Sequence, residues 1–332
     1  MKKVNFGTFL KKVILFLIPV FILVSCYFIC DPFKVLKNYQ SYSNNPVVLN
    51  QGYICWQNYL NRRDSLKYDS YILGNSCTMA YQSGDWAEFL SDAKPVRLFG
   101  SSESLQSILL KLRALDKDEV RINNVLLLLD RGTLQKITSP LSHSRILHPK
   151  VCGSGVFEFQ KVFFSAFINP QFLIPFLDYR LFGTYRSYMK GIIEVRDEHR
   201  NELTNDIINP REEEIALLGD KYWEKHRKEF PERDGIERIY EPSVGKKQED
   251  MLREISMILK QHNTNYRIVI NPEYKQYRLN PMDFEKLKQI FGEDSVFDFS
   301  GVNDYTDNPK NFYEKSHYRP LLGRMILKEI YN

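Results

Sequence analysis

The sequence has few cysteines, and their placement argues against a disulfide framework. Of the five cysteines in 332 residues, Cys26 and Cys30 lie in one apolar run, which leaves Cys55, Cys77 and Cys152. Three is an odd number, and the spacing repeats no metal-binding motif. One disulfide could still form, and the sequence does not select its two cysteines. We expect no metal site.

Two other features are missing, a block of basic residues and a glycine-rich phosphate loop. The net charge is only +5, and acidic residues interleave with basic ones, as in RKEFPERDGIER at 227–238. Without a basic block that alternates with aromatic residues, the sequence argues against a nucleic-acid partner. Without a glycine-rich loop and a phosphate-binding lysine, a nucleotide-binding flavodoxin-like domain is the weaker alternative, and we expect no cofactor.

Only one long apolar run is present, and it lies near the N-terminus. Residues 13–30, VILFLIPVFILVSCYFIC, contain no charge and can nearly span a bilayer. Four lysines precede this run: Lys2, Lys3, Lys11 and Lys12. By the positive-inside tendency, residues 1–12 form a cytoplasmic basic tail and residues 13–30 a transmembrane signal anchor. The rest of the chain is then expected outside the cytoplasm, in the periplasm.

Two alternatives to a retained anchor remain. A cleaved signal peptide fits less well, because no A-x-A-like cleavage site follows the apolar run. A lipoprotein signal is possible at Leu23-Val24-Ser25-Cys26, but apolar residues continue past Cys26 to Cys30. Pro19 does not count against a membrane helix, since such helices tolerate proline.

Strands and helices alternate after an irregular segment. Residues 31–65 lack a steady period, and we expect a tether that packs on the domain. Within 66–130, the pattern predicts strands at 68–73, 95–99 and 120–130, and helices at 77–90 and 102–115. The same alternation returns in 247–332. There it predicts helices at 247–262, at 281–291 and from near Pro320, and strands at 266–271 and 295–299. We therefore expect one α/β domain with a parallel sheet, built from 66–130 and 247–332.

Residues 131–246 interrupt this domain, and we expect a largely helical, aromatic-rich insertion or cap. Its aromatic stretch, 156–183, is broken by Pro170 and Pro175 and contains Lys161 and Asp178. A packed or interfacial lid is therefore favoured over a second membrane span.

Ser76 follows the first predicted strand at a turn formed by Gly74 and Asn75. In a parallel sheet, ligands bind beyond the carboxyl ends of the strands, and a helix that starts there presents free N–H groups. A serine so placed can attack an acyl carbon if a histidine takes its proton. The alternative is a plain helix N-cap. Cys77 could itself be a nucleophile, although a lone buried cysteine is the commoner case.

His317 is the one histidine expected at the same edge of the sheet as Ser76. It lies after the last predicted strand and just before the helix that begins near Pro320. The other five histidines fall in expected loops or charged helices, where solvent exposure explains them. Glu314, three residues before His317, is close enough to orient its imidazole, as the third member of a triad must.

An early serine with a late acid and base, three residues apart, resembles the SGNH or GDSL hydrolase superfamily. That superfamily has a Gly-Asp-Ser-like first block and an Asp-x-x-His last block. Here Gly74-Asn75-Ser76 would be the first block, with Asn75 in place of aspartate, and Glu314-Lys315-Ser316-His317 the last, with Glu314 in place of aspartate. The resemblance covers residues 66–130 and 247–331 and implies a flavodoxin-like three-layer α/β/α sandwich.

The resemblance also implies roles for these residues. Ser76 would be the nucleophile, His317 the base and Glu314 the group that orients it. The N–H groups of Ser76 and Gly100 would bind the oxyanion, because Gly100 matches the superfamily's oxyanion glycine. The third-block Gly-x-Asn-Asp signature is missing, since the sequence reads Leu129-Asp130-Arg131-Gly132. Arg131 could replace the absent asparagine donor, although an arginine beside Asp130 is more often a structural ion pair.

With its apolar anchor, the chain is similar to the SGNH-like proteins that work beside membrane-bound O-acyltransferases. Those proteins take part in bacterial cell-surface polysaccharide acetylation and in D-alanyl transfer to teichoic acids. The resemblance implies a serine esterase or O-acyltransferase that acts on a surface polysaccharide, with a membrane-bound O-acyltransferase as a candidate partner. The alternative is a catalytically silent scaffold for such an acyltransferase or for a polysaccharide-export system, with the aromatic insertion as its contact surface.

Overall fold

The computed structural model describes residues 6–139, 141–194 and 199–332, which fall into two compact units. One, here called the helical unit, contains the described residues up to Leu49 and those from Gly155 to 194. The other, the sheet unit, contains Asn50–Ser154 and the described residues after 198. The cytoplasmic side predicted for Lys2 and Lys3 concerns positions outside the described residues.

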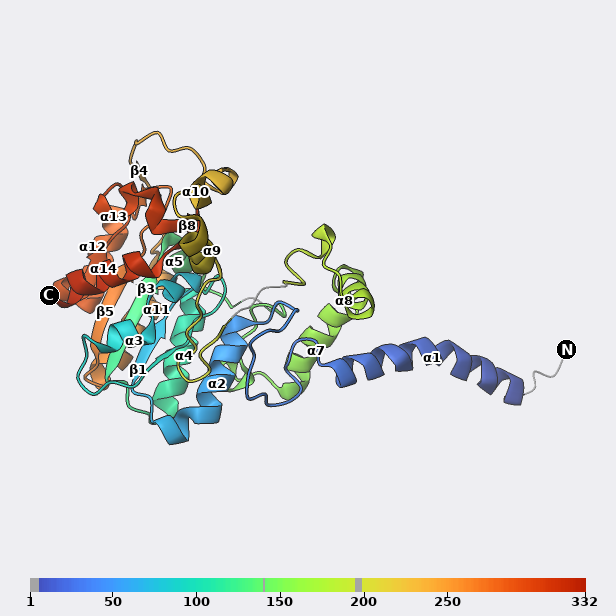
Figure 1. The fold of residues 1–332 in the computed structure, drawn as a ribbon. Helices are drawn as coiled ribbons and strands as arrows, with labels where there is room; N and C mark the ends of the chain where they lie inside the picture. The colour runs from blue at the N-terminus through green and yellow to red at the C-terminus, as the bar shows by residue number, and fades with distance from the viewer. Residues whose placement is uncertain (1–5, 140, 195–198) are drawn as a thin grey trace. The chain divides into compact units, whose positions relative to one another are not determined.

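A parallel sheet of five strands forms the centre of the sheet unit (Figure 1). Its strands are β1 (Ser70–Leu73), β2 (Pro95–Arg97), β3 (Asn124–Leu129), β5 (Asn265–Ile270) and β7 (Val296–Asp298). They lie in the order β2-β1-β3-β5-β7, which is 2-1-3-4-5 when these five are counted along the chain. This is a doubly wound order, which places β1 and β3 side by side at the point where the winding reverses.

Helices cover both faces of the sheet because its strands are apolar on both sides. In β3, Val125, Leu127 and Leu129 enter one buried cluster, and Leu126 and Leu128 enter another. The first cluster is covered by α2 (Gln51–Leu66), α4 (Leu105–Lys117), α11 (Lys246–Gln261) and α12 (Pro281–Phe291). The second is covered by the 3-10 helix η1 (Ser76–Ala80), α3 (Ser83–Ala87) and α14 (Pro320–Tyr331).

The remaining elements of the sheet unit are short. They are α5 (Arg131–Gln135), α6 (Pro149–Cys152), α9 (Arg211–Leu218), α10 (Lys221–Lys225), η3 (Arg227–Glu229), β4 (Arg238–Ile239), β6 (Tyr277–Arg278), η4 (Glu293–Ser295), α13 (Asp304–Asp307), η5 (Pro309–Asn311), β8 (Phe312–Glu314) and β9 (His317–Tyr318). Strands β8 and β9 pair as an antiparallel hairpin, and β4 pairs with β6.

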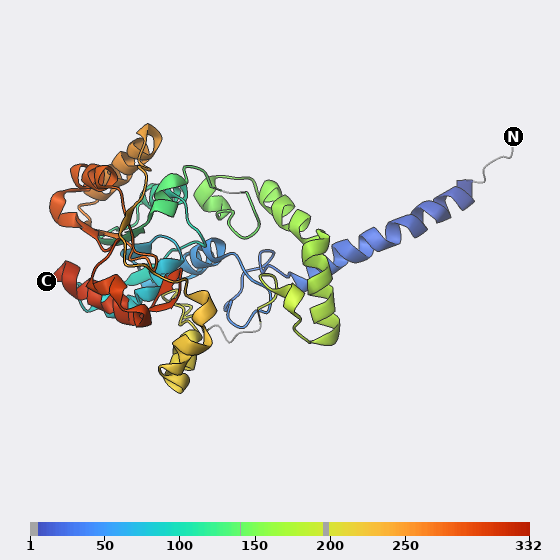
Figure 2. The ribbon, with the colours of Figure 1, turned by 90° about the horizontal axis from the view of Figure 1, so that it is seen from above.

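The helical unit consists of α1 (Phe6–Cys30), α7 (Val156–Phe167), α8 (Pro170–Phe182) and the short η2 (Ser187–Met189). Both views show α7 beside the C-terminal end of α1 (Figure 2). Among the described residues, α1 alone is long and apolar enough to cross a membrane. It runs through Cys26 without a break and ends at Cys30.

The α/β class and the central parallel sheet are confirmed, and the two discontinuous halves meet where β3 pairs with β5. Three expectations need correction. Residues 77–90 form η1 and α3 rather than one helix, because the chain is extended at Tyr81 and Gln82. The expected tether, 31–65, contains most of α2, whose Trp56 and Tyr59 are buried in the sheet unit's core. The expected insertion, 131–246, is divided between the two units.

Candidate active site

The corner between β1 and η1 places Ser76 at the carboxyl edge of the sheet. Gly74 has φ +145°, and a Cβ there would lie 2.7 Å from the carbonyl oxygen of Leu128, so the turn requires glycine. Asn75 is the N-cap of η1, because its Oδ1 accepts a hydrogen bond of 2.9 Å from the N–H of Cys77. Ser76 is therefore not the N-cap, and its hydroxyl is left for another partner.

That partner is His317. Ser76 Oγ lies 2.8 Å from His317 Nε2, and His317 Nδ1 lies 2.5 Å from Glu314 Oε1. Glu314 and His317 face each other across the β8–β9 hairpin, so the pairing of the two strands sets their contact. The backbone N–H of Ser316 donates to the second carboxylate oxygen of Glu314 at 2.8 Å. The structure thus brings together the three residues predicted as nucleophile, base and orienting acid.

The charge on Glu314 fixes where the imidazole proton lies. Burial opposes ionisation, but the hydrogen bond and charge of His317, together with the Ser316 N–H, outweigh it and hold the pKa of Glu314 below its ordinary value. An ionised carboxylate only accepts hydrogen bonds, so the proton of a neutral His317 belongs on Nδ1. Nε2 is then free to accept the proton of Ser76, as a general base must.

Part of the insertion holds the β8–β9 hairpin in place. The Tyr222 hydroxyl of α10 donates to the carbonyl of Tyr313 at 2.8 Å, and Trp223 Nε1 donates to the carbonyl of Phe312 at 3.2 Å. From α9, Glu212 accepts from the Tyr313 hydroxyl at 2.7 Å and from Arg319 at 2.8 and 2.9 Å. These contacts were missed at the sequence level, where α9 and α10 show only a charged surface pattern.

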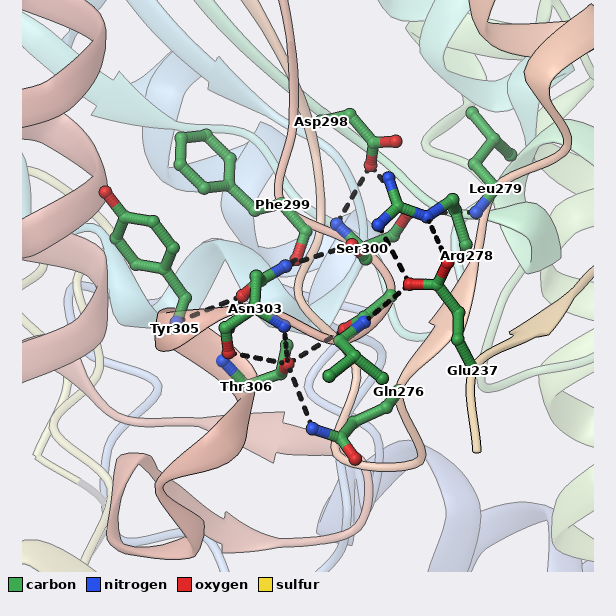
Figure 3. Close-up of polar contacts among 12 residues, drawn as sticks. Glu237, Gln276, Arg278, Leu279, Asp298, Phe299, Ser300, Asn303, Tyr305 and Thr306 are labelled. Atoms are coloured by element: carbon green, nitrogen blue, oxygen red, sulfur yellow. Dashed lines mark hydrogen bonds and ion pairs between the residues drawn. The ribbon is translucent and has the colours of Figure 1, made fainter. Parts of the chain in front are cut away.

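The loop that leads from β7 to the hairpin is held by its own polar contacts (Figure 3). Asn303 caps α13 in a capping box with Thr306, and its Nδ2 donates to the carbonyls of Phe299 and Ser300. Thr306 Oγ1 donates to the carbonyl of Gly301 at 2.8 Å. Asp298 Oδ1 accepts from the N–H of Ser300 at 2.9 Å. A loop with so many internal bonds can place Glu314 and His317 reproducibly.

Helix α14, which follows the hairpin, packs closely against η1. A Cβ at Gly323 would lie 2.1 Å from the carbonyl oxygen of Ala80, so the two backbones approach each other as only glycine permits. Hence the element that carries Ser76 and the helix that follows His317 have a fixed separation.

Of the two N–H groups expected to bind the oxyanion, one already has a hydrogen-bond partner. The N–H of Ser76 starts η1 and so has no acceptor within that helix. The N–H of Gly100, however, donates to the carbonyl of Gly74 at 3.3 Å.

The side chains considered as further donors have other partners. Asn75 Nδ2 donates to Asp130, and the Arg131 guanidinium lies over the Tyr240 ring, 4.7 Å from its centroid. Asp130 caps α5 through the N–H of Thr133, and no Arg131–Asp130 ion pair is found among the described residues.

A pocket of about 270 Å³ adjoins the hairpin turn. It is lined by Cys77, Asp130, Asn271, Pro272, Glu273, Tyr274, Lys275, Phe312, Lys315 and Ser316. Burial, reinforced by the negative charge of Asp130, raises the pKa of Glu273 to about 7, although the Tyr240 hydroxyl donates to it at 2.6 Å. Burial and nearby carboxylates, Asp130 first among them, also raise the pKa of the Cys77 thiol well above its usual value. A thiol held protonated is a poor nucleophile, which argues against the cysteine alternative.

Other histidines have their own partners. His148 is buried and bonds to Gln57 at 3.1 Å, contrary to the expected solvent exposure, and His262 bonds to Asp116 at 2.8 Å. His226 lies between Glu214 and Glu229. Within the described ranges, no three histidine, cysteine or acidic side chains are grouped so that they could hold a metal ion.

Comparison with known proteins gives no match: no family model, no curated protein and no solved structure matches the chain. A function for this site therefore has to follow from the serine, histidine and glutamate side chains and from the corner and hairpin that hold them.

Proposed function

We propose that the chain is a serine esterase or O-acyltransferase of the SGNH type, anchored in the membrane by residues 13–30. It would act outside the cytoplasm and add acyl groups to a cell-surface polysaccharide or remove them. One observation carries the proposal, the continuous contact from Ser76 Oγ through the His317 ring to Glu314 at the carboxyl edge of a parallel sheet. The strand order 2-1-3-4-5 supports the SGNH assignment, because it is that of a flavodoxin-like sandwich.

The chemistry proceeds in two halves. Ser76 Oγ attacks the carbonyl carbon of an acyl ester while His317 Nε2 takes the hydroxyl proton. The tetrahedral oxyanion collapses, the C–O bond to the leaving alcohol breaks, and His317 returns the proton to that alcohol. A sugar hydroxyl or a water molecule then gives its proton to His317 and attacks the acyl-serine. The bond between the acyl carbon and Ser76 Oγ breaks, and His317 returns the proton to Oγ, which restores Ser76. Glu314 stays ionised throughout and stabilises the imidazolium.

The catalytically silent scaffold remains the second candidate, and one contact favours it. The Gly100 N–H bonds to Gly74, so of the two expected oxyanion donors only the Ser76 N–H, which begins η1, has no acceptor inside its own helix. Loss of one oxyanion donor typically lowers kcat by about 10²- to 10³-fold. A chain that keeps the triad but lacks such donors would be a weak enzyme or none.

The test is hydrolysis of p-nitrophenyl acetate and labelling by a fluorophosphonate, with the full chain purified in detergent. Ser76→Ala and His317→Ala are compared with the wild type and with Ser165→Ala, which changes an exposed serine of α7 outside the site. We expect activity and labelling in the wild type and in Ser165→Ala, and a loss of about 10³-fold or more in both site variants. A folded wild type that neither hydrolyses the ester nor reacts with the probe would contradict the enzyme and favour the scaffold.

A further inference from the structure

The helices α7 and α8 expose large apolar side chains, of which Phe182 has the Arg186 guanidinium 5.9 Å from its ring centroid. Phe157 is 82% exposed, Leu181 74%, Phe182 67% and Ile174 59%. These exposed residues do not belong to an incomplete core, because helices α7 and α8, here called the α7–α8 hairpin, have a separate buried core. Its buried phenylalanines are Phe159, Phe163, Phe167, Phe172 and Phe176. The exposed apolar side chains therefore lie outside this core, and together they are here called the outer face of the α7–α8 hairpin.

The outer face continues from the surface of α1. Tyr27, in the last turn of α1, donates to Gln160 Oε1 at 3.1 Å, and its ring centroid lies 5.3 Å from that of Phe164. On α7, Phe157, Phe164 and Ile168 are spaced seven and four residues apart, so they lie along one side of the helix. The end of α1 thus meets the middle of this stripe, and Phe157 and Ile168 extend the apolar surface on either side of it.

The position of Tyr27 near the end of α1 determines the depth in the bilayer at which α1 would contact α7. The apolar run ends at Cys30, so Tyr27 lies where a membrane span would leave the hydrocarbon, which is the depth that tyrosine prefers. Helices of 12 and 13 residues are too short to cross a bilayer. The hairpin can therefore lie along the membrane surface but cannot form a second span.

The polar residues of this stretch also suit a membrane surface. Within residues 156–190 there are two acidic residues, Glu158 and Asp178. The basic residues outnumber them and are all exposed: Lys161, Arg180, Arg186 and Lys190. Tyr185 and Tyr188 are 44% and 52% exposed. Exposed apolar residues flanked by lysine, arginine and tyrosine are typical of segments that enter the headgroup region and are attracted to anionic lipids.

We propose that the α7–α8 hairpin is a membrane-interface element whose outer face enters the boundary between lipid headgroups and acyl chains. The proposal rests on α1 crossing the membrane, as the proposed function holds. The chain would then contact the bilayer twice, through α1 and through a hairpin 125 or more residues further on, which restrains the helical unit against the membrane plane.

The test is photo-crosslinking of the full chain in vesicles of phosphatidylethanolamine and phosphatidylglycerol. p-Benzoylphenylalanine is placed at Phe157 or at Leu181 in the outer face. Phe16 of α1, 78% exposed, is the reference for lipid contact, and Leu217 of the sheet unit, 86% exposed, is the matched control for an exposed apolar residue elsewhere. All four positions are exposed, so the probe should not disturb the core.

We expect severalfold more lipid adduct at positions 157 and 181 than at 217, and adduct at 16 as well. Lipid adduct at 16 alone would overturn the interface element and leave the anchor standing. Crosslinks from 157 or 181 to a second copy of the chain in place of lipid would also overturn it. Absence of lipid adduct at every position would remove the membrane anchor on which the proposal rests, and the esterase test on the detergent-purified chain would be unaffected.

Discussion

At the scale of single residues, the position of one proton decides whether Ser76 can react. Glu314 holds that proton on His317 Nδ1 because it is ionised and accepts only. The lowered pKa of Glu314 means that acid weakens this arrangement. As pH falls through the native pKa, the carboxylate is neutralised, and the stability that it contributed above the unfolded-state pKa is lost.

Glu314→Gln should lower kcat by about 10²- to 10⁴-fold and, because the stabilising charge is gone, should also lower the folding stability at neutral pH while the fold is kept. The glutamine amide can donate to Nδ1 and so favours the tautomer in which Nε2 carries the proton and cannot act as base. Ester hydrolysis and fluorophosphonate labelling measure the loss, and thermal unfolding shows that the fold is kept. A variant as fast as the wild type would show that Glu314 does not orient His317 for catalysis.

The pKa of Glu273 is raised rather than lowered, so its effect on stability changes with pH in the direction opposite to that of Glu314. Its pKa is about 7 in the folded protein against an ordinary 4.5, so the native state binds more protons than the unfolded state between these values. Stability therefore falls as pH rises from about 4.5 to 7. Glu273→Gln, whose amide oxygen can still accept from Tyr240, should be more stable than the wild type at pH 8 by about 1–3 kcal/mol and similar to it near pH 4.5.

Thermal unfolding of the detergent-purified chain at both pH values measures this difference. Glu213→Gln, a change at an exposed glutamate of α9, is the control and should show no pH-dependent gain. An equal effect of Glu273→Gln at the two pH values would mean that the carboxyl group is not protonated in the folded protein at neutral pH.

At the scale of elements, α9 and α10 act on the site through the β8–β9 hairpin. Glu212 joins α9 to Tyr313 and Arg319, which lie on the two sides of Glu314 and His317 in the chain. Its contacts are charge-assisted and partly buried, and hydrogen bonds of this kind contribute about 1.5–3 kcal/mol.

Glu212→Ala should therefore lower kcat for ester hydrolysis while KM changes little, at a temperature where the variant is still folded. The reason is that a looser hairpin places His317 less often within reach of Ser76. Glu213→Ala, one residue further along the same helix, has no such contacts and should behave as the wild type. If Glu212→Ala loses stability but keeps full kcat, the glutamate only stabilises the fold and does not position the hairpin.

The elements that sequence could predict are those with a local signal. The aliphatic run of β3 and the glycine turn before Ser76 indicate their own structure, and the order of serine, glutamate and histidine indicates a shared edge of the sheet. Helix α2 was missed because its polar residues obscure the period, although Trp56 and Tyr59 are buried. The engagement of the Gly100 N–H by Gly74 depends on a contact between two loops, which no local pattern encodes.

At the scale of the whole molecule, the candidate active site and the candidate membrane helix lie in different units. The triad, its hairpin and the helices that hold it all lie in the sheet unit, whereas α1 and the α7–α8 hairpin form the helical unit. The sheet unit supplies both η1 with Ser76 and strand β8 with Glu314 from segments far apart in sequence. Loss of the membrane contact should therefore leave the chemistry of the site intact.

The N-terminus of the mature protein distinguishes the two modes of attachment, a transmembrane anchor and a lipid. A retained anchor keeps residues 1–30, so alkaline carbonate should leave the protein in the membrane, and its intact mass should include the whole N-terminus. Cys26→Ala should change neither result, because α1 continues through Cys26 to Cys30 as an uninterrupted helix. A lipoprotein would instead begin at Cys26 with attached lipid, and Cys26→Ala would block its processing. Release by carbonate would contradict both forms of attachment, and a mass that starts at Cys26 would replace the transmembrane anchor with a lipid.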